Sequence, residues 1–186
     1  RGCDSMMEYA IDYAVSKGVI LICAAGNEAS TVSHPAMHDK VIAVSAINSN
    51  KYIAYFSNTG EEIDFTAPGV KILTGGPNNK NGYVDGTSFS APAITGFSIL
   101  SMLDDVNIDT KNELVIHLKQ YCEDLGEKGQ DDLYGYGLPV YERKGESETS
   151  RSPENTTIEE TTNGFETTTQ PETKKTEETT TQLETK

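Results

Sequence analysis

The chain has 186 residues, of which 35% are hydrophobic, and carries a formal net charge of −14 at pH 7. This length accommodates one domain of ordinary size, and the low apolar share predicts that part of the chain is unstructured. The acidic charge argues against nucleic acid and anionic membrane surfaces as partners, because both are bound through clustered Lys and Arg. No apolar run approaches the roughly 20 residues of a membrane span.

Composition divides the chain into two regions. Residues 1–142 alternate between helical and strand periodicities and predict one globular domain, whereas residues 143–186 are rich in Thr and Glu and nearly devoid of apolar side chains. Such a segment cannot bury enough surface to offset its ordering entropy, so we expect a disordered tail or spacer. Asn155-Thr156-Thr157 fits the N-glycosylation pattern, which applies only to a eukaryotic secretory source.

The globular region opens with an amphipathic helix over residues 5–17, which Gly18 ends. Its apolar face consists of Met7, Ala10, Ile11, Ala14 and Val15. Two continuously apolar runs follow, residues 19–25 and 41–46, in the pattern of parallel strands covered on both faces. Shorter strands are predicted near Tyr52 and over residues 63–65, 71–74 and 83–85, between turns rich in Asn, Gly and Pro.

Two helices complete the domain. The first is a buried helix that begins near Ser88 and continues in small and apolar residues to Leu103. The second is expected over residues 111–122, with a capping box formed by Thr110 and Glu113. Its apolar face consists of Leu114, Val115, Leu118 and Tyr121. This order of elements predicts an α/β sandwich with a mostly parallel sheet.

Cysteine usage indicates neither a disulfide framework nor a zinc site. The three cysteines, Cys3, Cys23 and Cys122, are an odd number without metal-ligand spacing. Cys23 lies in an apolar run and is interpreted as a small core residue. The start at Arg1 rather than at methionine predicts that residues upstream are missing or were removed.

Ser88 stands at the expected start of a helix, in Gly86-Thr87-Ser88-Phe89-Ser90-Ala91-Pro92. The unpaired N–H groups and the dipole of a helix N-terminus favour negative charge, so a hydroxyl there can act as a nucleophile. Pro92 has no N–H to offer the Ser88 carbonyl, which leaves the turn around Ser88 open. A Ser/Thr N-cap followed by a proline in the first turn explains the same segment without chemistry.

A second candidate segment, Ala24-Ala25-Gly26-Asn27-Glu28, leaves the first strong strand. Ligands of open α/β sheets collect at the carboxyl ends of the strands. There Gly26 permits a close backbone approach and Asn27 offers an amide N–H donor. Gly-Asn by itself is typical of a plain turn. Beside an activated serine, the same donor suits the oxyanion that develops during acyl transfer.

These two segments resemble the nucleophile and oxyanion-hole segments of subtilisin-like serine peptidases. Other matching stretches follow the family's order within about residues 5–141: His34-Pro35-Ala36 and residues 41–44, 56–60, 63–69 and 134–137. The resemblance implies a three-layer α/β sandwich with a mostly parallel sheet, incomplete at its N-terminus. It also implies hydrolysis of peptide bonds in polypeptide substrates and a secreted or cell-surface location, which a Thr/Glu-rich spacer suits.

The resemblance implies roles for the matching residues. Ser88 is the acyl-accepting nucleophile, Asn27 is the side-chain donor of the oxyanion hole, and the Ser88 N–H is the second donor. The substrate-binding positions are Ala24, Ala25 and Gly26 in the pocket wall, Glu28 at its rim, and Gly86 and Thr87 beside the serine, with Thr87 supporting the hole. Asp85 replaces the more common asparagine of the family, which brings a carboxylate near the nucleophile.

No cofactor is expected, and no metal site is assigned. Glu62-Ile63-Asp64, with the stretch near Ala36, resembles a weak cation site of some family members. A weakly bound structural calcium therefore competes there with the simpler interpretation, which is a pair of solvated loop carboxylates.

The general base of the family is absent from the chain. That base is a histidine oriented by an aspartate, and His34, His38 and His117 all lie outside the family's His-Gly-Thr-His setting. We interpret each as structural or solvent-exposed. The chain is therefore expected to be the C-terminal half of a catalytic domain, inactive alone, with the upstream half as its partner.

Two other functions remain open. The first is a non-catalytic peptide-binding module, against which the retention of both Ser88 and Asn27 argues. The second is a different serine acyl hydrolase, against which the absence of a Gly-x-Ser-x-Gly elbow argues.

Overall fold

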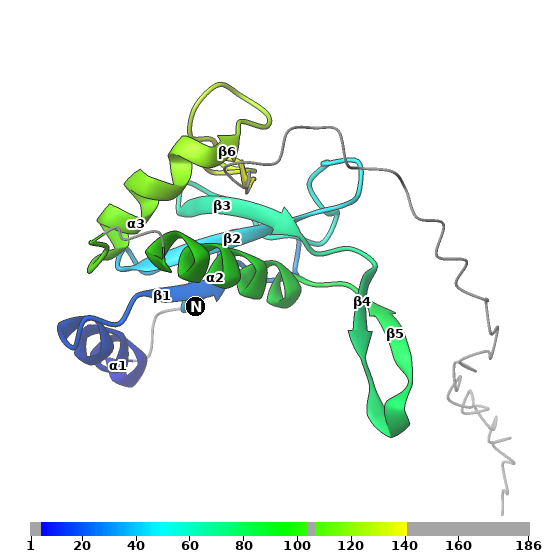
Figure 1. The fold of residues 1–186 in the computed structure, drawn as a ribbon, viewed down its shortest axis with the longest axis horizontal. Helices are drawn as coiled ribbons and strands as arrows, with labels where there is room; N and C mark the ends of the chain where they lie inside the picture. The colour runs from blue at the N-terminus through cyan, green and yellow to red at the C-terminus, as the bar shows by residue number, and fades with distance from the viewer. Residues whose placement is uncertain (1–4, 104–106, 141–186) are drawn as a thin grey trace, which may run out of the picture. The chain divides into compact units, whose positions relative to one another are not determined.

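A parallel three-stranded sheet lies at the centre of the molecule. The computed structural model describes residues 5–103 and 107–140, all within one compact unit, Arg1–Lys144. The sheet order is β1-β2-β3, with β1 at Leu21–Ala24, β2 at Val41–Ile47 and β3 at Ile63–Pro68. The strands point the same way (Figure 1), so their carboxyl ends lie at one edge. The predicted α/β fold with a mostly parallel sheet is confirmed.

The three strands differ in how far they are buried. β2 is buried at every residue, as its uninterrupted apolar run predicts. β1 is only partly buried along its length, so the prediction that this strand is covered on both faces is wrong. Within the described residues β1 pairs with β2 alone. Its outer edge therefore presents unpaired backbone groups to which another strand could add.

Helix α2, Thr87–Leu103, crosses one face of the sheet and runs back against the strand direction (Figure 1). Its buried stripe is formed by Thr87, Ser90, Ala91, Ile94, Ser98 and Ser101. Most of these side chains are small, so the helix packs closely on β1, β2 and β3, where Ile94 belongs to a core cluster that contains Phe65. On the outward face Ile99 and Leu103 are 54% and 74% exposed. The prediction of a buried helix therefore holds for the face on the sheet and is wrong for the outward face.

Helix α3, Lys111–Leu118, packs beside α2. The predicted capping box is present, since Thr110 Oγ1 accepts the Glu113 N–H and the Glu113 carboxylate accepts the Thr110 N–H. Leu114, Val115 and Leu118 are buried as predicted, but Tyr121 is 41% exposed. The α-helix ends at Leu118 and a 3₁₀ turn over Lys119–Tyr121 follows, which rotates Tyr121 away from the apolar face.

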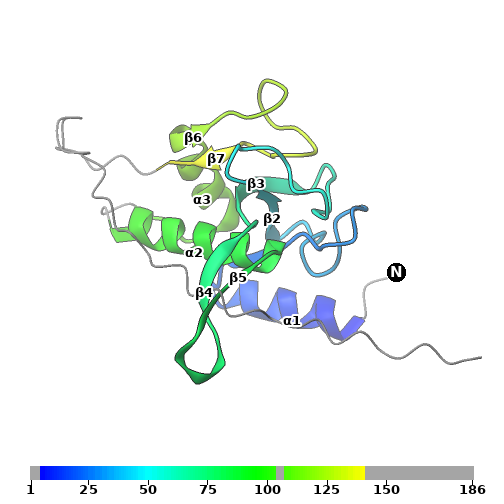
Figure 2. The same ribbon diagram turned by 90° about the vertical axis from the view of Figure 1, so that its right-hand side faces the viewer.

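Two antiparallel pairs flank the central sheet. β4, Ile72–Gly75, and β5, Asn81–Val84, form a hairpin across the 3₁₀ turn Pro77–Asn79, and this hairpin projects from the body of the molecule (Figure 2). β6, Cys122–Glu123, pairs with β7, Leu138–Pro139. Two-residue strands leave no sequence pattern, and neither was predicted. The strand expected near Tyr52 is a single bridge between Ile47 and Ile53.

Helix α1, Ser5–Ser16, matches the predicted N-terminal helix and is followed by Gly18 at φ 75°. Of its predicted apolar face only Ile11 is fully buried, and Met7 is 39% exposed. Among the helices of the described residues, none is long and apolar enough to cross a membrane. The expectations for residues 143–186, the pattern at Asn155 included, lie outside the described residues.

Candidate active site

The two predicted site segments meet where the end of β1 faces the start of α2. Asn27 Oδ1 accepts two hydrogen bonds from Thr87, one from its N–H and one from its hydroxyl, each 2.9 Å long. Thr87 Oγ1 in turn accepts the Gly26 N–H at 3.3 Å. Thr87 is fully buried. The segments are 60 residues apart in the sequence, so this junction is a tertiary feature that fixes Asn27 against the head of the helix.

These bonds determine which end of the Asn27 amide can serve a ligand. Both lone pairs of Oδ1 are used by Thr87, so the Nδ2 group is the end left to donate. A Cβ built on Gly86 would lie 3.7 Å from Asn27 Nδ2, which places this donor beside the peptide that leads into Ser88. Asn27 and Ser88 are both exposed. The Ser88 residue and the Asn27 amide donor therefore both reach solvent at the junction of the two segments.

The start of α2 is anchored to the segment after β3. The Gly86 N–H donates to the Gly69 carbonyl at 2.8 Å, and the Ser90 hydroxyl donates to the Ala67 carbonyl at 3.0 Å. A Cβ on Gly69 would collide with Ser90 Oγ, so only glycine permits this approach. Ser88 is the second residue of α2, and its N–H is therefore one of the four that lack an acceptor within the helix.

The predicted pocket-wall residues continue from β1. Ala24 ends the strand and is partly buried, while Ala25 is fully buried and donates its N–H to the Val44 carbonyl. Gly26 adopts φ +112°, a conformation that side chains disfavour. Glu28 is exposed, but its Oε2 accepts the Asn27 N–H at 2.9 Å. The contacts of these residues with substrate stay predictions.

Asn58 is a site residue to which the sequence assigned no role. It lies in a stretch of the family resemblance. In the structure Asn58 is 1% exposed, and its side chain is hydrogen-bonded to the loop that carries Asn27. A polar residue this deeply buried is one that the fold must satisfy completely. Gly60, two residues further on, indicates a turn, and this is the only hint in the sequence that Asn58 lies in a loop.

Asp85 and two of the three histidines contact groups outside the junction of Asn27 with Thr87. Asp85, expected close to the nucleophile, accepts the Lys71 N–H at 2.7 Å at the base of the hairpin. His38 Nδ1 accepts the Lys40 N–H, and the His117 ring lies 5.3 Å from that of Tyr121. His34 Nδ1 is buried, and no described residue forms a hydrogen bond with it.

Asp64 is not a solvated loop carboxylate, as the sequence suggested. It lies in β3, is 6% exposed, and accepts the Ala43 N–H at 2.9 Å. Its Oδ2 is 3.1 Å from Lys111 Nζ, so this carboxylate is already paired with an ammonium group. Burial raises the pKa of Asp64, and Lys111 opposes the rise. Within the described residues no group of three or more His, Cys, Asp or Glu could hold a metal ion.

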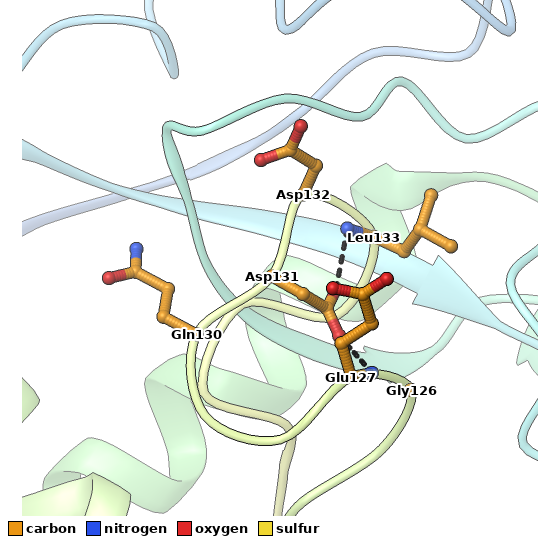
Figure 3. Close-up of a pocket in the computed structure, with 6 residues that line it drawn as sticks. All are labelled: Gly126, Glu127, Gln130, Asp131, Asp132 and Leu133. Atoms are coloured by element: carbon orange, nitrogen blue, oxygen red, sulfur yellow. Dashed lines mark hydrogen bonds between the residues drawn. The ribbon is translucent and has the colours of Figure 1, made fainter.

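A pocket formed by one loop lies apart from the residues of this site. Figure 3 shows its lining: Gly126, Glu127, Gln130, Asp131, Asp132 and Leu133. The Asp131 carboxylate accepts the N–H groups of Glu127 and Leu133 at 3.0 and 2.8 Å. These bonds organise the loop itself, which accounts for the acidic lining without a ligand.

Comparison with known proteins identifies the family. The subtilase family model matches residues 1–137. The minor extracellular protease Epr of Bacillus subtilis is 36% identical over 135 residues, which cover 71% of this chain and 21% of that protein. Subtilisin DY of Bacillus licheniformis is 38% identical over 137 residues, which cover 71% of this chain and 48% of that protein. The chain thus spans less than half of the length of either relative.

A solved structure agrees with these sequence matches. The crystal structure of a lanthipeptide protease superposes with a TM-score of 0.64 at 25% identity, covering 72% of this chain and 52% of the other. Since a family model matches most of the chain, and relatives at 36% and 38% identity cover 71% of it, the chain belongs to the subtilase family of serine proteases.

Proposed function

We propose that this protein is a subtilisin-like serine endopeptidase in which Ser88 attacks the scissile carbonyl. Ser88 Oγ bonds to the carbonyl carbon and gives its proton to a base, and the base returns that proton to the leaving amine. Water then hydrolyses the acyl-enzyme. Asn27 Nδ2 and the Ser88 N–H stabilise the oxyanion. The observation that carries this proposal is the pair of bonds from Thr87 to Asn27 Oδ1, which leaves Nδ2 as the donor.

The base and its aspartate come, in this proposal, from the upstream half of the same catalytic domain, and the chain by itself is inactive. Two surfaces suit the docking of that half. One is the outer edge of β1, and the other is the apolar outward face of α2, where Ile99 and Leu103 are exposed. Burial of such surfaces is the main favourable term in association. The short span of the chain relative to its relatives is consistent with a missing half.

The proposal also places the protein outside the cell, either secreted or at the cell surface. One relative is described as extracellular, and another, from Bacillus subtilis, as intracellular. The Thr/Glu-rich residues 143–186 favour the first. Fractionation of the producing cells, followed by detection of the protein in the medium, at the surface or inside, decides between them.

Labelling with a fluorophosphonate probe tests the activity. The complete protein should be labelled at Ser88 and should cleave a polypeptide, and Ser88→Ala should lose both. Ser98→Ala is the matched control, because Ser98 lies in the same helix with its hydroxyl bonded to the Ile94 carbonyl. Asn27→Ala should lower kcat about 100- to 1,000-fold, a factor measured on a subtilisin and carried over to this chain.

Three outcomes would count against parts of the proposal. Rapid labelling of Ser88 in the isolated chain would show that its base is already present. Peptide binding without cleavage by the complete protein would favour the non-catalytic module. Cleavage that survives Ser88→Ala would assign the chemistry to another residue.

A further inference from the structure

The loop that carries Asn27 is organised by one buried side chain. We propose that Asn58 is a positioning residue, which fixes Asn27 in the geometry needed to donate to the oxyanion. The inference rests on the proposed function for its consequence in catalysis. Asn58 is 1% exposed and lies after β2, in the segment that runs beside residues 26–31.

Every hydrogen-bonding group of the Asn58 amide is engaged with this loop. Oδ1 accepts the N–H groups of Glu28 and Ser30 at 2.9 and 3.1 Å, which uses both lone pairs. Nδ2 carries two hydrogens and has three acceptors within reach, which are the Ala25 carbonyl at 3.2 Å and Ser33 Oγ and Glu28 Oε2 at 2.9 Å each. The Asn58 N–H donates to the Gly26 carbonyl at 3.0 Å. Only an asparagine side chain offers two acceptor lone pairs and two donor hydrogens in this volume.

A relay through Glu28 connects Asn58 to Asn27. Glu28 Oε2 accepts both Asn58 Nδ2 and the Asn27 N–H, each at 2.9 Å. Asn27 is therefore held at two points: its side chain by Thr87 and its backbone by Glu28. Bonds to a carboxylate are stronger than bonds between neutral groups, so this relay restrains the backbone effectively.

Close packing makes the arrangement specific. A Cβ on Gly26 would collide with Asn58 Nδ2 and would lie 2.8 Å from both Glu28 Oε2 and Ser33 Oγ. The loop can therefore approach Asn58 only with glycine at this position. An oxyanion donor must lie within hydrogen-bond distance of the developing charge, and a misplacement of about 1 Å can cost on the order of 100-fold in rate.

The principal variants are Asn58→Asp and its control Ser57→Ala, made in the complete protein. Aspartate keeps the volume of Asn58 but cannot donate to the Ala25 carbonyl, and it places a second carboxylate beside Glu28. We expect kcat to fall about 10- to 100-fold with KM changed less than about 3-fold. Ser57 is also buried, and its hydroxyl accepts the Ala46 N–H and donates to the Asn58 carbonyl. Its variant leaves every bond of the Asn58 side-chain amide in place, so kcat should stay within about 2-fold.

A double-mutant cycle separates positioning from general damage. In an Asn27→Ala background, Asn58→Asp should lower kcat by less than about 3-fold further, because the donor it positions is gone. Glu28→Ala interrupts the relay at an exposed residue, so folding is not at risk, and kcat should fall several-fold. Multiplicative losses in the cycle, or an unchanged kcat in Asn58→Asp, would overturn the proposal.

An amide resonance provides a readout that needs no activity. In ¹H–¹⁵N spectra the Asn27 backbone amide should shift in Asn58→Asp and in Glu28→Ala, and should stay in place in Ser57→Ala. An unmoved Asn27 amide in both variants would refute the positioning role whether or not the protein is a peptidase. Conversely, an intact kcat in Asn27→Ala would refute the proposed oxyanion role and leave the structural relay measurable.

Discussion

Replacement of Lys111 by methionine should destabilise the protein, because Lys111 is the partner of a buried carboxylate. Lys111 Nζ lies 3.1 Å from Asp64 Oδ2, with the two side chains 21% and 9% exposed. The same ammonium donates to the carbonyls of Asp39 and Val41 at 3.1 and 2.7 Å. Methionine keeps most of the side-chain volume and removes all three contacts. What remains is a buried charge without its counterion.

The expected loss at pH 7 is about 3 kcal/mol. Removal of one partner from a fully buried pair costs about 3–5 kcal/mol, and the partial exposure of Lys111 favours the lower end. Burial raises the pKa of Asp64, with Lys111 opposing the rise. A carboxyl whose folded pKa exceeds its unfolded value stabilises at low pH, and this contribution is lost as pH rises through the folded pKa. Lys111→Met raises that pKa further, so its cost should shrink as pH falls towards 4.

Urea unfolding of the complete protein between pH 4 and 8 measures this effect. With an m value of about 2 kcal/mol/M, the midpoint should fall by about 1.5 M at neutral pH. In an Asp64→Asn background, Lys111→Met should cost much less, because no charge is left unpaired. A loss below about 1 kcal/mol that does not vary with pH would refute the reasoning, since the pair would then behave as a solvated one.

Other residues give shorter predictions. Thr110→Ala removes the cap of α3 and should cost about 1 kcal/mol in the same urea assay. Leu114 is fully buried, so Leu114→Ala should lower the free energy of unfolding by about 2–5 kcal/mol. Ile116 is 55% exposed, so Ile116→Ala should lower it by less than about 1 kcal/mol. Burial raises the pKa of the Cys122 thiol to about 12, so iodoacetamide at pH 8 should alkylate it only after denaturation, and fast native alkylation would contradict this. The isolated chain should lack a cooperative thermal transition with native-like near-UV circular dichroism, because β1 leaves an open strand edge.

Local patterns predicted the elements whose periodicity is long or whose boundary chemistry is explicit. β2 follows from an unbroken apolar run, and the start of α3 follows from its capping box at Thr110. The helical periodicity failed to predict burial where an α-helix changes to a 3₁₀ turn without a break in the apolar spacing. Tyr121 continues the helical spacing of Leu118, yet it falls in a 3₁₀ turn and is exposed. Periodicity carries no information about where a helix tightens.

The site divides in the same way. Ser88 and Asn27 became candidates because a helix start and a strand end each leave a local signature, and the family resemblance supplied their roles, which stay predictions. Asp64 was misinterpreted although a strand was predicted over residues 63–65, because no pattern within that strand shows that Lys111 approaches from α3 and makes the burial of a carboxylate tolerable. Asn58 could not be assigned at all, since its role consists of bonds to residues about 30 positions away. Tertiary hydrogen bonds of this kind are invisible to any pattern within one segment.

The two burial predictions that are wrong have one physical cause. The apolar run of β1 and the outward residues of α2 both indicate covered surfaces, yet within the described residues β1 is only partly buried and the outward face of α2 is exposed. An apolar sequence reflects the environment in which a segment is stable, which is the complete domain. The proposed upstream half would add a strand to β1 and lie over Ile99 and Leu103. On this argument, the apolar residues that are exposed mark the surface that the proposed upstream half would cover. Substitution of Ile99 by a charged residue should therefore weaken the association with that half and leave the bonds between Thr87 and Asn27 intact.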